Sequence, residues 1–557
     1  MSSSDANIAW TLTQRAESDP DLAAIHQPGK GRDPLSRYYE TLTFKELEDY
    51  SNQLANALLG SGIKPGSRAV LMVRPSLEFF GLTFAVFKAG IIPVFIDPGM
   101  GVRGLGKCIE ESRATAFIAI PAAHWARRLF GWGRGQLKQF VVIKSVSRLK
   151  SWGSGLSGTM NVAIFPKSVP QSGSTCDHQT SAILFTSGST GPAKGVVYTH
   201  RIFHAQVAAL RDLLAIKAGE IDLCTFPLFA LFAPALGMTS VIPKMDFTRP
   251  GRVDPLEVVG PVARFQVSNL FGSPALLRRV QAFGSLHQAT LPSLNRVVSA
   301  GAPVPADVIA GMKAMLRPDA QVFTPYGATE SLPVACIGSD EILGETAALT
   351  AQGLGVCVGR PVVGMKVVII PVTNAPIGSM DETQTLATGE VGEIVVAADQ
   401  VTQTYDARPE ANAAAKIRDD SLAPPRYRHR MGDLGYLDGQ GRLWFCGRKA
   451  HRVWTEQGPL DTIPTEALFN QHPSVFRTAL VGVGDIGHQR PVVCVELNPG
   501  RHDWNKIHAD LIAIAIRQPH LARIKHFLVH HSFPVDVRHN SKIFREKLAI
   551  WAARRLH

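Results

Sequence analysis

The sequence predicts an α/β fold with parallel-rich sheets flanked by helices, and two observations predict it. Helical and strand-like hydrophobic patterns alternate in the early part of the chain, which is typical of βαβ units and a parallel sheet. The 557 residues are 45% hydrophobic, which allows large cores and excludes a disordered chain, a collagen-like fibre or a small disulfide scaffold. At about 150 residues per domain, the length allows roughly three or four structural units.

The first elements follow in order. Residues Phe44 to Leu59 have the apolar spacing of a helix, and Thr43 and Glu46 have the spacing of a capping box at its start. Three more elements are expected in turn: a strand at 68–73, a helix at 80–88 and a buried strand at 90–96. The uncharged stretch 223–243 is interrupted by prolines and glycine, so we expect a buried wall rather than a membrane span.

The segment Ala123 to Phe140 mixes large apolar and basic side chains. A basic amphipathic segment of this kind can contact a membrane surface or a partner protein. Surface segments more often pack their aromatic side inward, and that arrangement is the prediction here. The apolar and basic members are Trp125, Leu129, Phe130, Trp132, Leu137 and Phe140 with Arg127, Arg128, Arg134 and Lys138.

Charge and cysteine usage limit the classes of function. With 58 Lys+Arg against 46 Asp+Glu, the net charge is +12, which suits phosphorylated molecules, anionic membranes and nucleic acid. Nucleic acid is set aside because the chain has no recognised nucleic-acid-binding motif or aromatic-basic platform. Seven widely spaced cysteines without a CxxC pair indicate neither a disulfide framework nor a zinc site, and the start of the chain lacks signal-peptide features. A cytoplasmic location is therefore expected.

A phosphate-binding loop is the first motif that carries chemistry. The short apolar strand Ser181 to Phe185 leads into three glycines, four hydroxyl residues and one lysine within ten positions. Backbone N–H groups and hydroxyls in such a turn can surround a polyphosphate, and Lys194 adds a positive charge. The spacing is not that of a Walker A motif, because Gly195 follows the lysine where serine or threonine would be required.

The order Thr-Ser-Gly-Ser-Thr-Gly-x-x-Lys-Gly resembles the phosphate loop of the adenylate-forming superfamily, which includes acyl-CoA synthetases, peptide-synthetase adenylation domains and luciferases. Further motifs that resemble those of the superfamily follow in order and extend the similarity over nearly the whole chain. They are Ser299–Pro303, Tyr326–Glu330, Gly359–Pro361, Gly389–Ile394, Met431–Tyr436 and Phe445–Arg448.

The resemblance implies an ATP site with Mg²⁺. In it, Tyr326 stacks on adenine, Thr329 holds the α-phosphate, Glu330 ligates Mg²⁺ and Asp433 accepts hydrogen bonds from the ribose. An aromatic face suits a base, and a carboxylate suits a hard cation. The implied nucleotide-binding set is Thr186, Ser187, Gly188, Ser189, Thr190, Gly191, Lys194, Gly301, Ala302, Pro303, Tyr326, Gly327, Thr329, Asp433 and Arg448.

The resemblance also implies two domains. An N-terminal ATP- and substrate-binding domain covers residues 1–448, and a smaller mobile α+β lid covers 449–557. The lid carries Lys542, which by similarity reaches the carboxylate and the α-phosphate during adenylation. The implied catalytic residues are Lys542, Glu330 and Thr186.

Three departures from the superfamily pattern bear on the acceptor and on the acyl site. The hinge position, usually Asp or Lys, is Ala450, and the loop at 458–466 is one residue longer than usual. Both changes count against a CoA acceptor. A histidine that gates the acyl site in relatives is replaced by Ala230 within an apolar run. That run can line a hydrocarbon pocket through Phe226, Phe229 and Phe232, or it can be a buried segment without a ligand.

Together these features resemble the β-lactone synthetase group of bacterial long-chain olefin biosynthesis. The resemblance implies conversion of a long-chain 2-alkyl-3-hydroxyalkanoic acid and ATP to a cis-3,4-dialkyl β-lactone, AMP and pyrophosphate. It also implies association with a β-lactone decarboxylase and a 2-alkyl-3-ketoalkanoic acid reductase. The alternatives are a long-chain acyl-CoA or acyl-carrier ligase and a non-enzymatic acyl-nucleotide-binding scaffold. Whether the carboxyl or the hydroxyl is adenylated, and which base takes the hydroxyl proton, stay open.

Overall fold

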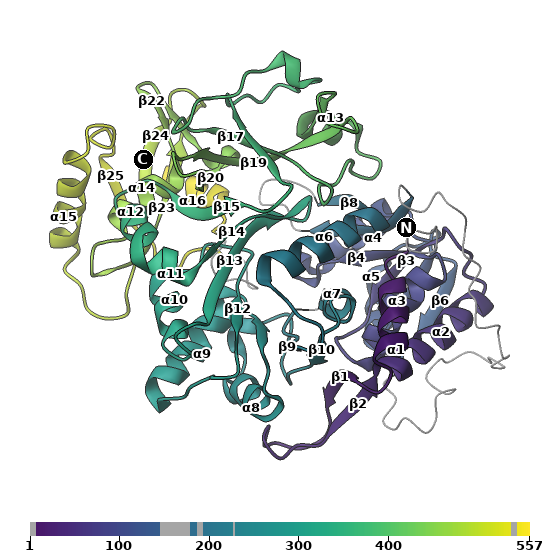
Figure 1. Cartoon of the computed structure of the whole chain (residues 1–557). Coiled ribbons are helices and arrows are strands. Elements are labelled where there is room, and N and C mark those ends of the chain that lie inside the picture. Colours follow the sequence, from purple (N-terminus) through teal and green to yellow (C-terminus); the bar gives the residue numbers. More distant parts are fainter. Residues whose placement is uncertain (1–6, 145–178, 187–192, 227–228, 536–542, 557) are drawn as a thin grey trace.

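The computed structural model describes residues 7–144, 179–186, 193–226, 229–535 and 543–556. Two large sheets lie before residue 449, and a two-stranded and a three-stranded sheet follow it (Figure 1). Helices cover the large sheets, and the predicted α/β class is confirmed. Most of residues 151–180, where the composition predicts a loop, lie outside the described part of the chain.

The first large sheet has six strands in the order β6-β5-β3-β4-β7-β8. All neighbours are parallel except the hairpin β7–β8, in which Thr186 pairs with Lys194. The strands are β3 (Arg68–Met72), β4 (Ile92–Ile96), β5 (Ala116–Ala119), β6 (Gln139–Val142), β7 (Thr180–Thr186) and β8 (Lys194–Thr199). The helices in this part are α1 (Trp10–Ser18), α2 (Phe44–Gly60), α3 (Leu77–Lys88), α4 (Gly101–Glu111), α5 (Pro121–Phe130) and α6 (His200–Leu214), with a short 3₁₀ turn η2 (Pro98–Met100).

Two of these helices show how local sequence sets the structure. The predicted capping box at the start of α2 is confirmed, because the Glu46 N–H donates to the Thr43 hydroxyl at 3.2 Å and the Thr43 N–H donates to the Glu46 carboxylate at 2.8 Å. Such caps typically stabilise a helix by about 1 kcal/mol. In α3 every residue from Leu77 to Phe87 is buried, which agrees with its apolar character on all sides.

The second large sheet has fourteen strands. Its path runs β16-β17-β19-β20-β15-β14-β13-β12-β11-β9-β10-β1-β2, with β18 paired to β19. The stretch from β13 to β1 is parallel, and the other pairs are antiparallel. The strands are β1 (Ala23–Pro28), β2 (Tyr39–Thr43), β9 (Ile221–Leu223), β10 (Thr239–Val241), β11 (Asn269–Phe271), β12 (Arg296–Val298), β13 (Gln321–Ala328), β14 (Ser331–Gly338), β15 (Val356–Pro361), β16 (Lys366–Ile370), β17 (Gly392–Ala397), β18 (Lys416–Asp419), β19 (Arg426–Leu437) and β20 (Leu443–Arg448).

Helices and short turns connect these strands. The helices are α7 (Phe229–Ala235), α8 (Leu256–Phe265), α9 (Pro274–His287), α10 (Ala306–Lys313), α11 (Ser339–Glu341), α12 (Ala347–Ala351) and α13 (Pro409–Ala415). The turns are the 3₁₀ segments η5 (Pro250–Arg252) and η7 (Met380–Glu382) and the π-helical turn η6 (Ile342–Thr346). The described residues between 223 and 243 are mostly buried, as predicted.

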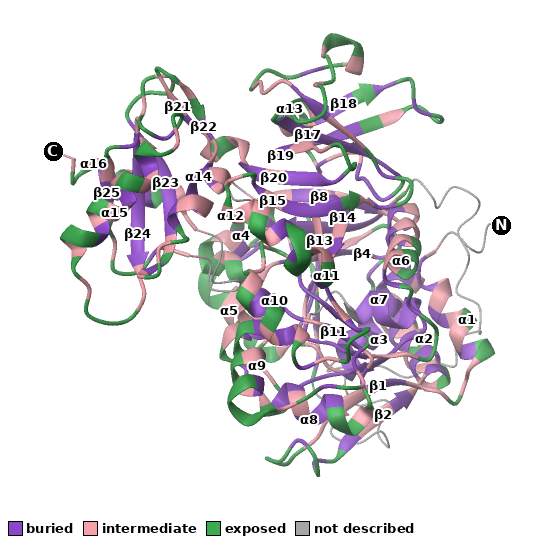
Figure 2. Ribbon diagram, turned by 60° about the vertical axis from the view of Figure 1, so that its left-hand side comes forward, coloured by how far each residue is buried: buried purple, intermediate pink, exposed green. Residues whose placement is uncertain are grey.

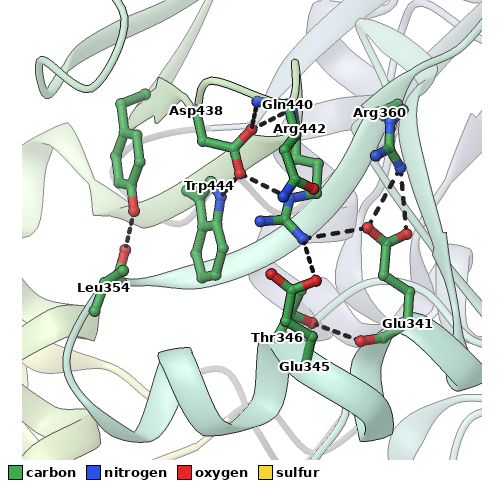
Figure 3. Close-up of polar contacts among 10 residues, drawn as sticks. Glu341, Glu345, Thr346, Leu354, Arg360, Asp438, Gln440, Arg442 and Trp444 are labelled. Carbon is green, nitrogen blue, oxygen red and sulfur yellow. Dashed lines mark hydrogen bonds and ion pairs between the residues drawn. The ribbon is translucent and has the colours of Figure 1, made fainter.

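An ion-pair network holds the turn between β19 and β20 (Figure 3). Arg442 lies 2.7 Å from Asp438 and 2.9 Å from Glu345 of η6, and the Trp444 indole donates to Asp438 at 2.8 Å. Its carboxylate partners hold the pKa of Arg442 above the ordinary value. Because β19 and β20 continue from this turn toward Asp433 and Arg448, the network helps to fix two predicted nucleotide-binding residues.

The described strands after Arg448 form two small sheets that are not hydrogen-bonded to the large ones. Together with the helices of this part they enclose two hydrophobic clusters of their own (Figure 2). Strand β24 pairs antiparallel with β23 and parallel with β25. The division at 448/449 and the motion of a lid stay predictions. The elements are η8 (Lys449–His451), β21 (Val453–Thr455), β22 (Gly458–Leu460), α14 (Thr462–Phe469), β23 (Val475–Val483), β24 (Arg490–Leu497), α15 (Trp504–Ile516), β25 (His526–Val529) and α16 (Arg545–Ala553).

The predicted inward packing of the segment 123–140 is wrong for most of its large apolar residues. Trp132 and Leu137 are buried, but Trp125, Leu129, Phe130 and Phe140 are exposed, and α5 contains no buried residue. The physical reason is that the small and polar stripe of α5 faces the sheet. Within the described residues, no helix combines the length and the apolar character that crossing a membrane requires.

Candidate active site

One cavity of about 610 Å³ lies between the two large sheets and reaches the start of the C-terminal part. Its wall is formed by α3, α6 and α7, by the ends of β7, β8, β12 and β13, and by β19 and β20. The charged groups of the wall include residues of β8, β20 and the turn after β13. Its large apolar groups include residues of α3, α6 and α7. The cavity can therefore hold a ligand that has both a charged and a hydrocarbon part.

The charged part of the wall includes Lys194, Glu330 and Arg448. The Tyr405 hydroxyl donates to Glu330 Oε1 at 2.7 Å, and the ammonium of Lys194 lies 5.0 Å from the centre of the Tyr405 ring. Thr329 is held through its carbonyl, which accepts a hydrogen bond of 2.5 Å from the Tyr198 hydroxyl. Tyr405 thus contacts both a cation and a carboxylate on this wall, and Tyr198 fixes the backbone next to Glu330.

At this wall Arg448, whose side chain is 34% exposed, continues into a chain of polar contacts with the buried Asp433 and with Tyr326. The Tyr326 hydroxyl donates to Asp433 Oδ2 at 2.6 Å, and the Arg448 guanidinium lies 2.9 Å from Oδ1. Burial raises the pKa of Asp433, and the charge of Arg448 opposes that shift. The pKa of Arg448 is raised, chiefly by the Asp433 carboxylate.

Lys416 and His429 add a second buried polar pair beside the cavity. They are directly opposite each other in the β18–β19 pairing. Burial lowers the pKa of Lys416 to about 7, and its ammonium donates to the Thr402 carbonyl. Burial, and then the neighbouring Lys416, lower the pKa of His429 well below its ordinary value, so this imidazole is neutral at pH 7.

The apolar wall is larger than the sequence predicts. Phe226 and Phe232 line the cavity as predicted, and Phe229 is the first residue of α7. The sequence reasoning missed the contributions of α3 and α6, which include Phe79, Phe87, Phe203, Leu210 and Leu214. The available signal was the all-apolar pattern of α3, since a helix without a polar face is buried on every side.

The other predicted nucleotide-binding residues lie as follows. Thr186 ends β7 opposite Lys194, and Gly301, Gly327 and Thr329 contribute to the cavity wall. In the described part of that wall, Ala302, Pro303, Tyr326 and Asp433 are not among the lining residues. The predicted residues Ser187, Gly188, Ser189, Thr190, Gly191 and Lys542 lie outside the described part of the chain.

Tyr405, Lys416 and His429 were not predicted as site residues. They are separated from Glu330 by 75 or more positions, and none stands in a motif with an assigned chemical role. Only the fold brings them to the cavity.

The carboxylate of Glu330 is suited to Mg²⁺ through its chemistry and its position on the cavity wall. In the part of the chain that the structure describes, no group of three or more His, Cys, Asp and Glu side chains could hold a metal by itself. Mg²⁺ is commonly bound by one or two carboxylates together with substrate phosphates, and a single glutamate on the wall of a nucleotide cavity fits that pattern.

Comparison with known proteins agrees with this geometry. Residues 12–406 match the family model of the AMP-binding enzymes. Olefin β-lactone synthetase from Stenotrophomonas maltophilia is 48% identical over 554 residues, which cover 99% of this chain and 98% of that protein. The enzyme of the same name from Xanthomonas campestris is 48% identical over 555 residues, which cover 98% and 97%.

Among solved structures, the amide bond synthetase from Marinactinospora thermotolerans has a TM-score of 0.75 at 21% identity, covering 98% of this chain and 99% of that one. This likeness supports the fold alone. The family match spans the motifs at 186–195, 299–303 and 326–330, and the chain belongs to the AMP-binding enzyme family.

Proposed function

We propose that the protein is an ATP-dependent β-lactone synthetase of olefin biosynthesis. It converts a long-chain 2-alkyl-3-hydroxyalkanoic acid and ATP to a cis-3,4-dialkyl β-lactone, AMP and pyrophosphate. The observation that carries the proposal is the 48% identity, from end to end, with two olefin β-lactone synthetases. The cavity, which joins Lys194 and Glu330 to an apolar wall of phenylalanines and leucines, supports it.

The first step activates the carboxylate. A carboxylate oxygen attacks the α-phosphorus of ATP, the bond to the β-phosphate oxygen breaks and pyrophosphate leaves, so that an acyl-adenylate remains. Lys194, together with Lys542 by resemblance, would neutralise negative charge that develops on the phosphate oxygens. Asp433 would accept hydrogen bonds from the ribose. The Arg448 guanidinium forms an ion pair with Asp433 Oδ1 at 2.9 Å and so helps to orient this carboxylate.

Glu330 would hold Mg²⁺ through its carboxylate, with Tyr405 fixing one of its oxygens at 2.7 Å. When bound, Mg²⁺ would supply charge neutralisation and alignment of the triphosphate. The described residues provide no further carboxylate cluster for it, so the phosphates would complete its coordination.

The second step closes the ring. The β-hydroxyl oxygen attacks the acyl carbon, the bond from that carbon to the phosphate oxygen breaks, AMP leaves and the hydroxyl proton is lost. Because nucleophile and acyl carbon belong to the same molecule, closure needs positioning rather than an external acceptor. An apolar wall lets the two alkyl chains fold beside the acyl carbon and keeps water from hydrolysing the adenylate.

A hydrocarbon-rich β-hydroxy acid is the proposed substrate, and the other olefin-pathway enzymes, a β-lactone decarboxylase and a 2-alkyl-3-ketoalkanoic acid reductase, are the proposed partners. Ala450 lies on the cavity wall beside Arg448 and Lys449. A methyl group at this position supplies neither the charge nor the hydrogen bonds of the Asp or Lys usual in the superfamily, which is consistent with a reaction that needs no second acceptor.

The test is a mass balance with ATP, Mg²⁺ and the 2-alkyl-3-hydroxy acid, with and without CoA. A product equal to the acid minus water, formed without CoA and identified as a lactone by NMR, is expected. The matched substrate lacking the 3-hydroxyl should release pyrophosphate without forming lactone. A product that requires and contains CoA would instead identify an acyl-CoA ligase.

Isotope labelling distinguishes the two possible sites of adenylation. With both carboxylate oxygens labelled with ¹⁸O, carboxyl activation places one label in AMP and one in the lactone carbonyl. Adenylation of the hydroxyl would leave AMP unlabelled and both labels in the lactone. Mass spectrometry of AMP therefore decides between the routes.

A further inference from the structure

Helix α5 and the segment after it present an exposed surface of large apolar and basic side chains, which we call the α5 surface. Trp125 is 72% exposed and Leu129 is 78% exposed. They are four positions apart, so they lie on one face of the helix, with Arg128 beside them. The α5 surface consists of Trp125, Arg128, Leu129, Phe130, Arg134, Lys138 and Phe140.

The opposite stripe of α5 is already packed, so the helix cannot turn its large apolar residues inward. Ala123 and Ala126 pack against the core of the six-stranded sheet. The His124 ring forms a hydrogen bond of 3.0 Å with the carbonyl of Val141 in the edge strand β6, and the Arg127 guanidinium lies 4.2 Å from the centre of the Phe140 ring. The outward direction of Trp125 and Leu129 is therefore built into the packing.

The charge around this surface has one sign over a long stretch of sequence. The described residues 112–144 contain six Lys and Arg and no Asp or Glu. A stretch of 33 residues in a chain with 46 acidic residues would hold about three if they were evenly spread. The surface is therefore complementary to something negatively charged.

We propose that the α5 surface binds the anionic face of a phospholipid bilayer, with Trp125 and Leu129 entering the interface. Tryptophan favours the boundary between headgroups and acyl chains, and a short amphipathic helix flanked by Lys and Arg is the usual form of a peripheral anchor. Nucleic acid would match the positive charge of the surface, but its phosphate backbone would give the exposed Leu129 and Phe130 no apolar surface to contact. An acidic protein partner is the remaining alternative, and it is favoured over the bilayer if the wild type shows no preference for anionic vesicles.

The inference goes beyond the proposed lactone synthesis, since the α5 surface contributes no residue to the described wall of the cavity. It gives the enzyme a place where a substrate with two long alkyl chains is concentrated. Vesicle binding can be measured without substrate, so failure of this inference and failure of the proposed reaction are separate outcomes.

The test is sedimentation of the full-length protein with vesicles of phosphatidylethanolamine and phosphatidylglycerol, against vesicles of phosphatidylcholine alone. The wild type should bind the anionic vesicles and lose binding at high salt. The double variant Trp125→Ser/Leu129→Ser and the charge variant Arg128→Glu/Lys138→Glu should each lower the partition coefficient about tenfold or more. Pyrophosphate release with substrate dispersed in detergent should be unchanged in both variants.

A matched control separates this surface from general hydrophobicity. Leu286 and Ile486 are 77% and 78% exposed, and Leu286→Ser/Ile486→Ser should bind vesicles like the wild type. The proposal is overturned if the wild type does not prefer anionic vesicles, or if the two α5 variants bind as well as the control.

Discussion

The Tyr326 hydroxyl donates a hydrogen bond of 2.6 Å to a carboxylate 107 residues further along the chain, that of Asp433. Arg448 lies 2.9 Å from the other oxygen of this carboxylate. A buried carboxylate with two fixed partners has little freedom to rotate, so its remaining acceptor sites have set directions. In the proposed enzyme these directions serve the ribose hydroxyls of ATP.

Tyr326→Phe removes the hydroxyl and keeps the ring. We expect kcat/KM for ATP to fall about tenfold or more, mainly through KM, because one hydrogen bond to a carboxylate contributes about 1.5–3 kcal/mol. Tyr436→Phe is the control, since its hydroxyl donates to the Leu354 carbonyl outside the site. An equal effect of the two variants on KM would show that Tyr326 acts only on stability.

Lys542→Ala should slow pyrophosphate release about a hundredfold or more, because a positioned cation that stabilises a developing charge contributes several kcal/mol. The unfolding temperature should stay near that of the wild type. Lys547→Ala is a matched control in α16, where the ammonium lies over the Phe544 ring at 4.7 Å. Normal pyrophosphate release by Lys542→Ala would remove this lysine from the reaction.

Glu330→Gln keeps an oxygen that accepts from the Tyr405 hydroxyl and removes the negative charge. The Mg²⁺ concentration at half-maximal pyrophosphate release should rise about tenfold or more, because the ion loses a charged ligand. Tyr405→Phe keeps the carboxylate and should shift this midpoint much less. A magnesium titration in which Glu330→Gln matches the wild type would contradict the assignment.

Leu210 lines the cavity from α6, whereas Leu213 lies in a separate hollow beside Ala209 and Val362. Leu210→Trp should therefore raise KM for long-chain acids several-fold and leave shorter acids nearly unaffected, because added volume in a filled apolar site clashes with the ligand. Leu213→Trp is the control on the same helix. Substrate competition between acids of different length measures the effect, and no change in chain-length preference would place the hydrocarbon elsewhere.

Asp222 is fully buried on β9 and accepts from the Asn269 side chain. Burial raises its pKa from 3.8 to about 7. Because the folded state then keeps a proton that the unfolded chain releases, this stabilisation is complete below pH 3.8 and is lost as the pH rises through 7. Asp222→Asn should stabilise the fold by roughly 2–4 kcal/mol at pH 8 and change it little near pH 4.

Denaturant unfolding at the two pH values measures this difference. Asp485→Asn, at an exposed position, is the matched control variant. A stability change of Asp222→Asn that is the same at pH 4 and pH 8 would mean that Asp222 does not titrate in this range.

Several features could be predicted because their cause is local in the sequence. The capping box of Thr43 and Glu46 needs only four consecutive residues, and the strand before the phosphate loop was recognisable from its apolar run. The order of the nucleotide motifs likewise identified the family. In each case the residues that interact, or that carry the signal, are neighbours along the chain.

The tertiary structure decided what depends on distant neighbours. The contact of Tyr405 with Glu330 and the α3 and α6 side of the cavity join segments far apart in the sequence. The rotation of α5 about its own axis is the clearest case. Its sequence allows either the alanine stripe or the stripe of Trp125 and Leu129 to face the sheet. Ala123 and Ala126 fit closely against the six-stranded sheet, and close packing of that stripe leaves Trp125 and Leu129 to the solvent.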